Sequence, residues 1–324
     1  MTNNTQNQAN IENTEWFNLA ILKFEQAVNP IFIPLTKLCA LAIGGILLWL
    51  ALIVAKEALP AISKFGLRFL TETTWDPVRE QYGAFPQLYG TLLSSFLALL
   101  FAVPIGLGVA IFLSEDFLPP KIQQALAFLV ELLAAIPSVV YGLWGIAVVV
   151  PLFKNIGTWL HQQYGWLFLF STPPSATGFG MLPAGIVLAI MVLPTIAAIS
   201  RDALITLPPE LRQAAVGLGA TRWETIIKIL IPAAFSGIVG AIMLALGRAL
   251  GETMAVTMVI GNVNQISISV LAAGNTVASL LVNKFAEAGG LEISALMYAS
   301  LMLFLMTLIV NILAELLVRR VQRI

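Results

Sequence analysis

The sequence has very little cysteine, histidine and charge: its 324 residues include one cysteine, one histidine and only 10% charged side chains. The single cysteine, Cys39, excludes a disulfide bond within the chain and a cysteine-based metal site. His161 has no companions for a metal cluster or for a histidine-dependent catalytic triad. No Gly-x-x-x-x-Gly-Lys-Ser/Thr loop occurs, and no basic run suggests a nucleic-acid partner. We therefore expect no metal, no cofactor and no ATP bound through a phosphate loop.

Apolar residues, in contrast, are abundant. They make up 59% of the chain, and the mean hydropathy is +0.91. One soluble core cannot bury so much apolar surface, so long runs must face lipid, where helices satisfy their own backbone groups. The alternating strands of about ten residues that build a membrane barrel are absent. The sequence predicts an all-α, polytopic membrane protein.

Six segments approach the ~20 residues that a membrane-spanning helix needs. They are Leu35–Ala55, Tyr89–Leu113, Ala125–Leu152, Leu182–Ile205, Ile226–Val259 and Ile293–Val318. The third and fifth are too long for a simple crossing, so each is expected to contain a tilt, a break or an interfacial extension. Pro104, Pro137 and Pro194 each interrupt an apolar segment, and each permits a bend because it frees a backbone carbonyl.

These spans divide the chain into parts with expected locations. Residues 1–34 form a cytoplasmic N-terminal segment, 35–56 the first transmembrane helix, 57–87 an extracytoplasmic segment, 88–318 a five-helix core and 319–324 a cytoplasmic tail. The extracytoplasmic segment mixes tryptophan, proline and glycine, which predicts a small ordered structure. Placing both termini in the cytoplasm puts ten lysines and arginines inside and six outside, and a basic VRRVQR follows the last span.

The amino end is polar and lacks the basic region and cleavage site of a signal peptide. Two structures are open for residues 16–28: an amphipathic helix on the membrane surface, or a disordered tail that leads into the first span.

Two ionisable residues lie deep in the fifth apolar segment, in LGRALGETMAV. Arg248 and Glu252 are four residues apart, which places both on one face of a continuous helix, within reach of each other. Charged groups at membrane depth are costly and usually face a partner or a water-filled path. The arginine fork suits a tetrahedral oxyanion, whereas the alternative is a self-satisfied ion pair that fixes helix packing. Glu131 is a second intramembrane carboxylate, for which a buried bond to a neighbouring helix is expected.

The longest polar interruption in the second half is LPPELRQAAVGLGATRWETIIKILIP, residues 207–232. The two prolines and the later glycines predict a short helix that begins after the prolines and breaks at Gly217 or Gly219. Small side chains on such a helix would let it seat closely in a groove of another protein. An ordinary turn between two membrane helices is the alternative.

The order of residues in this loop resembles the coupling loop of ABC-importer permeases, with Ala214, Ala215 and Gly219 at the family's spacing. Gln213 stands where that family usually has glutamate. The resemblance implies a type I (MetI-like) permease fold of six transmembrane helices, with a coupling loop at about residues 206–225 that docks on an ATPase. Because Gln213 removes a carboxylate, the contact at this position is in question.

The segments QYGAFPQLYGTLLSS, ELLAAIPSVVYGLWG, LPTIAAISRDAL and GRALGETMAVTMVIGN together resemble the PstC-type permeases of phosphate ABC importers, from about residue 81 to the C-terminus. This resemblance implies a non-catalytic subunit of a prokaryotic cytoplasmic membrane, with Arg248 and Glu252 at positions linked to phosphate passage. The implied partners are a homologous second permease, a dimer of ATP-binding subunits, an extracytoplasmic phosphate-binding protein and membrane lipid. Two alternatives are a permease for another oxyanion, such as molybdate or sulfate, and a secondary transporter or channel that needs no ATPase.

Overall fold

The computed structural model describes residues 2–321, and it describes side chains from residue 30 onward except those of 31, 317, 318 and 321. The chain separates into two compact units, Met1–Lys56 and Glu57–Ile324. The first unit is the larger part of helix α1 (Thr2–Phe65), in which apolar side chains such as Leu41 and Trp49 are 75% and 64% exposed. The backbone is helical through residues 16–28, whose side chains lie outside the described residues.

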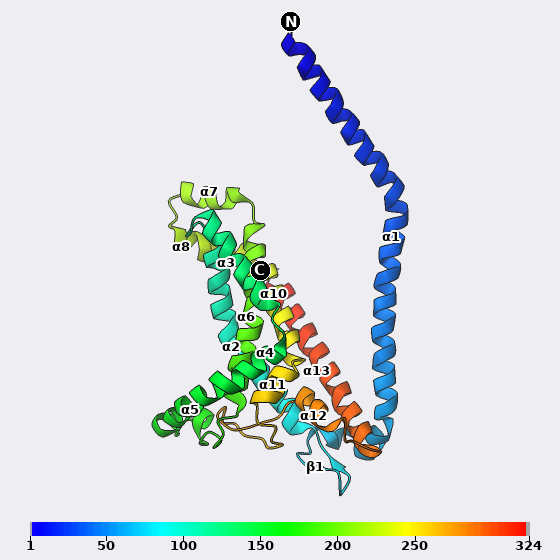
Figure 1. Cartoon of the computed structure of the whole chain (residues 1–324), viewed down its shortest axis with the longest axis vertical. Coiled ribbons are helices and arrows are strands. Elements are labelled where there is room, and N and C mark those ends of the chain that lie inside the picture. The colour runs from blue at the N-terminus through cyan, green and yellow to red at the C-terminus, as the bar shows by residue number, and fades with distance from the viewer. Residues whose placement is uncertain (1, 322–324) are drawn as a thin grey trace. The chain divides into compact units, whose positions relative to one another are not determined.

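The second unit is a helical bundle with a two-stranded hairpin (Figure 1). Its long helices are α2 (Phe85–Ser114), α6 (Met181–Ile205), α10 (Phe235–Leu250) and α13 (Leu291–Val321). The shorter helices are α3 (Pro120–Ala134), α4 (Ser138–Trp144), α5 (Val150–Tyr164), α7 (Pro209–Gly217), α8 (Arg222–Thr225), α9 (Ile231–Ala233), α11 (Met254–Val259) and α12 (Val277–Lys284). Single turns of 3₁₀ or π helix occupy Gly66–Leu70, Gly145–Val149, Phe168–Phe170 and Ile226–Leu230, and the strands are β1 (Trp75–Asp76) and β2 (Gln81–Tyr82).

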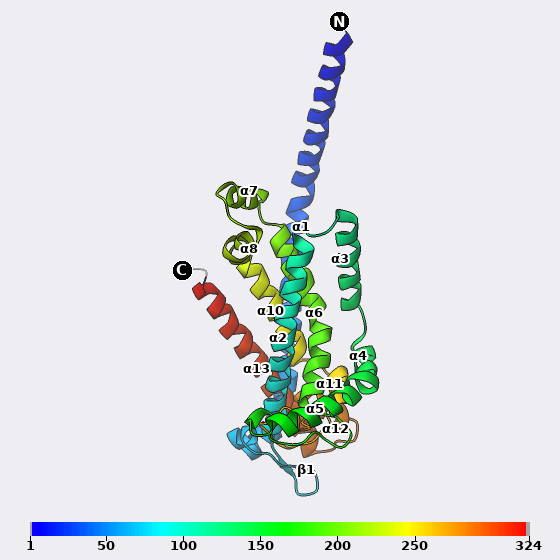
Figure 2. The ribbon, with the colours of Figure 1, turned by 90° about the vertical axis from the view of Figure 1, so that its left-hand side faces the viewer.

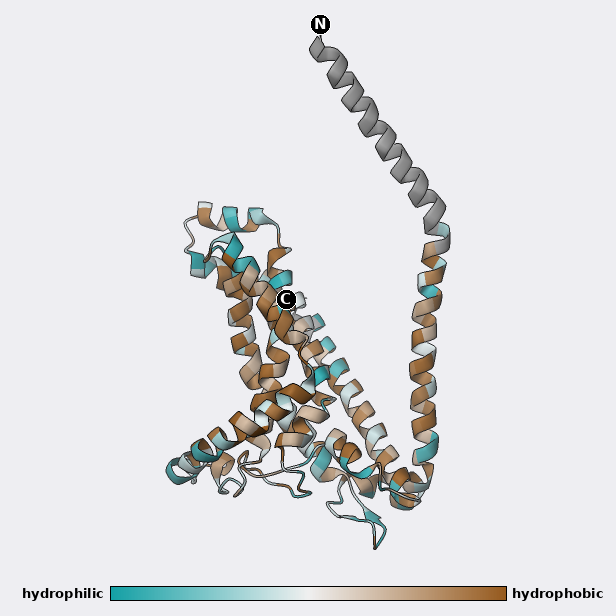
Figure 3. Cartoon of the chain, in the orientation of Figure 1, coloured by the Kyte–Doolittle hydropathy of each residue, from teal (hydrophilic) through white to brown (hydrophobic). Residues whose placement is uncertain are grey.

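Five helices in the described residues are long and apolar enough to cross a membrane, and a sixth crossing arises if one bent pair counts as a span. That pair, Arg222–Ala233 with Phe235–Leu250, bends by 69° at Ala234. The predicted all-α, polytopic architecture is therefore correct, and Figure 3 shows the apolar residues running along these helices.

Both segments that were too long for a simple crossing are broken. Pro137 precedes α4 and separates it from α3, so the expected third span is two helices that follow one another beside α6 (Figure 2). The expected fifth span is interrupted at Ala234 and again between α10 and α11. Pro104 and Pro194, in contrast, lie inside the continuous helices α2 and α6.

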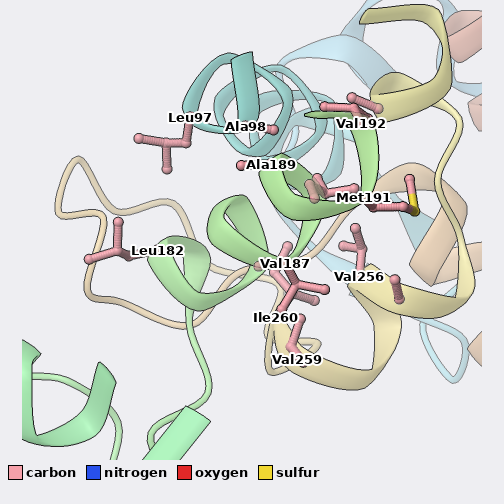
Figure 4. Packing of buried hydrophobic residues seen from close by; sticks show 14 of the residues in the cluster. Leu97, Ala98, Leu182, Val187, Ala189, Met191, Val192, Val256, Val259 and Ile260 are labelled. Atoms are coloured by element: carbon pink, nitrogen blue, oxygen red, sulfur yellow. The ribbon is translucent and has the colours of Figure 1, made fainter. Parts of the chain in front are cut away.

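The main core forms where α2, α6 and α11 meet (Figure 4). Val187 and Met191 of α6 are fully buried, as is Val259 of α11, and Leu97 of α2 packs against this cluster. Gly185 lets the helices approach closely, because a Cβ atom there would lie 2.7 Å from the Cβ atom of Leu97. This core fixes α2 and α6 as the rigid centre of the bundle.

The first turn of α6 is closed by a loop from much later in the chain. The backbone N–H of Met181 donates to the carbonyl of Ala272 at 3.0 Å, and that of Leu182 donates to Val270 at 2.8 Å. The N–H of Gly180 donates to Val259 at 3.2 Å. These bonds satisfy donors that a helix N-terminus leaves unpaired within the helix itself.

The segment before α2 is ordered, as its composition predicts. Phe69 is fully buried and its ring stacks on that of Tyr298 in α13, with 4.4 Å between centroids. The Trp75 indole N–H donates to Glu292 at 3.1 Å. This segment is thereby attached to the first turns of α13.

Candidate functional site

Helix α10 ends inside the apolar part of the bundle, four residues before the next helix begins. Its last residue is Leu250, and Gly251–Thr253 separate it from Met254, the first residue of α11. The prediction that Arg248 and Glu252 share one face of a continuous helix is therefore wrong. No ion pair joins the two side chains in the part of the chain that the structure describes.

Arg248 lies in the last turn of α10 and is partly exposed. Across residues 2–321, the structure gives its guanidinium no hydrogen bond and no carboxylate within 4.0 Å. The carbonyl-rich end of α10 favours a cation there. The guanidinium is thus favoured by a helix end, and in the described residues its N–H donors remain free for an anion.

Glu252 has a different local role from the expected one. Its carboxylate accepts from the backbone N–H of Ala255 at 3.3 Å, so it caps the first turn of α11. A negative charge at a helix N-terminus is favourable, just as a positive charge is at a C-terminus. Each member of the expected pair is therefore stabilised by its own helix end rather than by the other.

One face of α10 beside Arg248 is open. A Cβ atom added at Gly240 or at Gly247 would meet no atom within 4 Å. Beyond Gly240 lies a groove of about 500 Å³ between α10 and α13, lined by Ser236, Val239, Gly240, Met243, Leu244, Asn311, Glu315 and Arg319. This face is uncovered within the described chain.

The expectation of a buried bond for Glu131 is also wrong. Its side chain is 58% exposed, and its only charged neighbour in the described residues is Arg201, with 3.9 Å between Oε1 and Nη1. Arg201 also lies 3.4 Å from Asp202. The pair with Glu131 is long and half solvated, so it contributes little.

The polar loop folds into α7 and α8 at one end of the bundle (Figure 1). As predicted, α7 begins at Pro209 after another proline and ends at Gly217. Gly219 has a φ of +87°, a conformation that favours glycine, and it lies in open space. Thr221 then starts α8 with a capping box, because its hydroxyl and the Glu224 carboxylate accept from each other's backbone N–H.

The small residues of the loop do not share one environment. Gln213 and Ala214 are exposed, whereas Ala215 is 3% exposed and packs within its own chain. Ala215 is therefore almost entirely covered by its own chain, where its small size serves packing, and its contact with an ATPase stays a prediction. Sequence reasoning also missed the large apolar side chains that the loop exposes. Those of Val216, Leu218, Trp223 and Ile227 are 62%, 90%, 60% and 59% exposed.

Exposed apolar groups gathered on a polar loop are typical of a protein interaction surface. The run Val-Gly-Leu-Gly was the signal for it, because it places two large apolar side chains at the end of the polar helix α7. No group of three or more histidine, cysteine, aspartate or glutamate residues that could hold a metal occurs in the searched part, residues 2–321.

A family model described as binding-protein-dependent transport system inner membrane component matches residues 102–323. A phosphate transport system permease protein PstC of Haemophilus influenzae is 43% identical over 301 residues, which cover 91% of this chain and 95% of that protein. The protein of the same name from Pasteurella multocida is 46% identical over 268 residues, 81% of this chain and 83% of its own. A probable PstC of Methanocaldococcus jannaschii is 38% identical over 79% of this chain and 82% of its own.

Solved structures resemble the fold at lower identity. A bacterial alginate ABC transporter in complex with an alginate-bound periplasmic protein gives a TM-score of 0.60 at 17% identity, over 92% of this chain and 98% of the other. An inward-facing MetNI methionine ABC transporter gives a TM-score of 0.53 at 20% identity, over 75% of this chain and 95% of the other.

Proposed function

We propose a function for this chain from its family: it belongs to the PstC phosphate transport permeases, within the binding-protein-dependent transport system inner membrane components. It is a multi-pass inner-membrane subunit of a phosphate ABC importer and catalyses no covalent chemistry. It forms one half of the translocation pathway. Hydrolysis of ATP takes place on a partner subunit.

The observation that carries this proposal at the level of residues is the unpaired guanidinium of Arg248. A charge at membrane depth is retained where it faces a partner or a path. Here the described residues offer Arg248 no carboxylate, while α10 is open beside it at Gly247. A planar fork with free N–H donors binds two oxygens of a phosphate at once. We assign Arg248 to the phosphate path, and Glu252 to the opposite side of the α10–α11 break, where its negative charge limits how tightly an anion is retained.

The α7–α8 loop is the surface for the ATPase. Leu218 and Trp223 provide its exposed apolar area, and Gln213 and Ala214 lie on the same loop. The ATPase of an importer is cytoplasmic, so this assignment puts the loop, residues 206–225, on the cytoplasmic side of the membrane. Both chain termini are then assigned to the same side. Residues 57–87 and the β1–β2 hairpin then lie outside, where a phosphate-binding protein delivers the ion. Residues 88–318 form the permease core.

The second permease is assigned to the open face of α10. The absence of any atom near Gly240 and Gly247 allows another helix to approach the backbone there. The solved alginate transporter is in complex with a substrate-bound periplasmic protein, which supports a binding protein as a partner of this chain. The two permeases together would enclose the pathway around Arg248. One ATP-binding subunit would dock on the α7–α8 loop of this chain, and a second on the corresponding loop of the other permease.

The test is uptake by the whole importer in liposomes. The chain is purified with its second permease and ATPase, reconstituted, and supplied with the binding protein and radiolabelled phosphate. We expect uptake that requires ATP inside the vesicle and that unlabelled phosphate suppresses. Absence of phosphate uptake, together with ATP-dependent uptake of labelled molybdate or sulfate, would assign the chain to another oxyanion. Uptake that persists without ATP would assign it to a channel or secondary transporter.

A further inference from the structure

The end of α2 and the turn that follows it, residues 113–119, are held by arginines from three different helices. Arg201 of α6 donates through Nε to the Leu113 carbonyl at 3.4 Å. Arg222 of α8 donates to the Asp116 carbonyl at 3.3 Å. Arg212 of α7 reaches the carboxylate of Glu115. The exposed loop is therefore tied to the end of α2, which is far from it in sequence.

The bond between Arg212 and Glu115 is the strongest of these ties. Two guanidinium nitrogens, Nε and Nη2, lie 3.2 and 2.9 Å from the same oxygen, Oε1. Nη2 also donates to the carbonyl of Leu204, the penultimate residue of α6, at 3.0 Å. The side chain of Glu115 is 10% exposed and that of Arg212 is 26% exposed. A pair withdrawn from water in this way is screened little by salt, and removing one partner leaves the other charge uncompensated.

A second contact on the same turn is weaker. The Arg222 guanidinium carbon lies 5.1 Å from the ring centroid of Phe117, which is within the range of a cation–π contact. The Trp223 ring lies 6.1 Å from the same ring. Arg222 and Trp223 belong to the part of the loop that exposes apolar surface. The loop therefore contacts the α2–α3 turn at two places, Glu115 and Phe117. Of these two contacts, only the one at Glu115 is a mostly buried charge pair.

Helix α2 is anchored at its other end as well. The Tyr89 hydroxyl donates to the Ser267 carbonyl at 3.0 Å, and the Gln87 amide donates to Asn264 at 2.9 Å. The hydroxyl of Thr91 accepts from the backbone N–H of Val277 at 3.1 Å. One continuous helix of 30 residues thus joins the α7–α8 loop to residues 264–277 at the opposite end of the bundle. A displacement of the loop that moves α2 therefore also moves the contacts of α2 with residues 264–277.

We propose that Glu115 and Arg212 are positioning residues that transmit movement of the α7–α8 loop to α2. This inference rests on the proposed function, in which an ATPase docks on that loop. With the pair intact, the loop and the end of α2 move as one body when the ATPase closes. Without it, the loop still docks and ATP is still hydrolysed, but α2 follows the loop incompletely.

The first measurement is the number of phosphate ions imported per ATP hydrolysed, for each assembled complex in liposomes. Glu115→Gln keeps the shape of the side chain and removes its charge. We expect the ratio to fall at least about five-fold, the lower end of the usual coupling between sites, with hydrolysis maintained. Adding Arg212→Gln should cost little more, because residues of one bonded pair are not additive. Glu131→Gln, which breaks the long and half-solvated pair with Arg201, is the matched control.

A wild-type ratio in Glu115→Gln overturns the proposal. So does a variant in which less complex assembles while each assembled complex keeps the wild-type ratio, because that result indicates a purely structural pair. Glu115→Asp keeps the charge and should retain more of the ratio than Glu115→Gln does.

A second measurement does not depend on phosphate. Spin labels on Glu210→Cys in α7 and Phe112→Cys in α2, in a Cys39→Ser background, report the distance between the loop and the end of α2. We expect this distance to be the same with and without ATP when Glu115 is present, and to depend on the nucleotide in Glu115→Gln. A distance that depends on ATP in both proteins overturns the transmission role. Absence of phosphate uptake in the wild type would instead count against the proposed function and leave this distance readable.

Discussion

The most direct prediction concerns the charge of Arg248. Replacing it by glutamine keeps a polar side chain of similar length but removes the cation and the planar fork. The helix end should tolerate this change, because the structure gives Arg248 no protein bond among residues 2–321. The variant should therefore assemble normally and fail in transport.

The size of the effect follows from the surroundings of the guanidinium. Two unit charges 4 Å apart attract by about 4 kcal/mol near a protein surface. Arg248 is partly exposed, so solvent screening reduces this to roughly half, about 2 kcal/mol. At about 1.4 kcal/mol for each factor of ten, Arg248→Gln should slow phosphate uptake by about 30-fold. Arg248→Lys keeps the charge and loses the fork, so its loss should be smaller, about 5-fold to 10-fold.

The assay is the initial rate of ATP-driven phosphate uptake in liposomes, normalised to the amount of assembled complex. Arg320→Gln is the control, since it removes an exposed arginine from the last turn of α13. Uptake by Arg248→Gln within two-fold of wild type would refute the reasoning. A loss that appears only as reduced yield of folded complex would refute it equally, because it would make Arg248 a packing residue.

Three further outcomes are expected. In Glu252→Gln the side chain can still accept from the Ala255 N–H, so the complex should assemble normally. Phosphate should leave the path more slowly, which lowers both the maximal rate and the half-saturation concentration of uptake. Unchanged uptake kinetics would contradict the tuning role of Glu252. Gly219→Ala forces a side chain into φ +87° at a cost of about 1–2 kcal/mol and should reduce ATPase retention in detergent, whereas Gly217→Ala, also in open space, should retain it. Ala215→Trp should disorder the loop itself, since Ala215 is 3% exposed, and protease cleavage within the loop should increase; wild-type resistance would show that the site has room.

Local chemistry made the loop predictable from the sequence. Proline fixes the start of α7 and glycine permits its end, and both effects act within a few residues. The burial of Ala215 was not predictable in this way, because it depends on segments that fold against the loop. The Glu115–Arg212 pair was invisible for the same reason, since 97 residues separate its members.

The break between α10 and α11 is the most instructive miss. The segment LGRALGETMAV is apolar and rich in good helix formers, so a continuous helix was the natural prediction. Glycine is common in membrane helices, and Gly251 therefore did not mark an end. Glu252 and Thr253 were the overlooked signals, because a short polar pair before an apolar run is typical of a helix start.

The dependence of α6 on a later loop has a consequence for synthesis of the protein. When α6 enters the membrane, the carbonyls of Val270 and Ala272 that close its first turn have not yet been made. About ninety residues must follow Met181 before these acceptors exist, and unpaired N–H groups are costly in a bilayer. The nascent α6 must meanwhile keep its first turn at the hydrated surface. Its final depth is therefore set only when residues 270–272 have been made and can accept these hydrogen bonds.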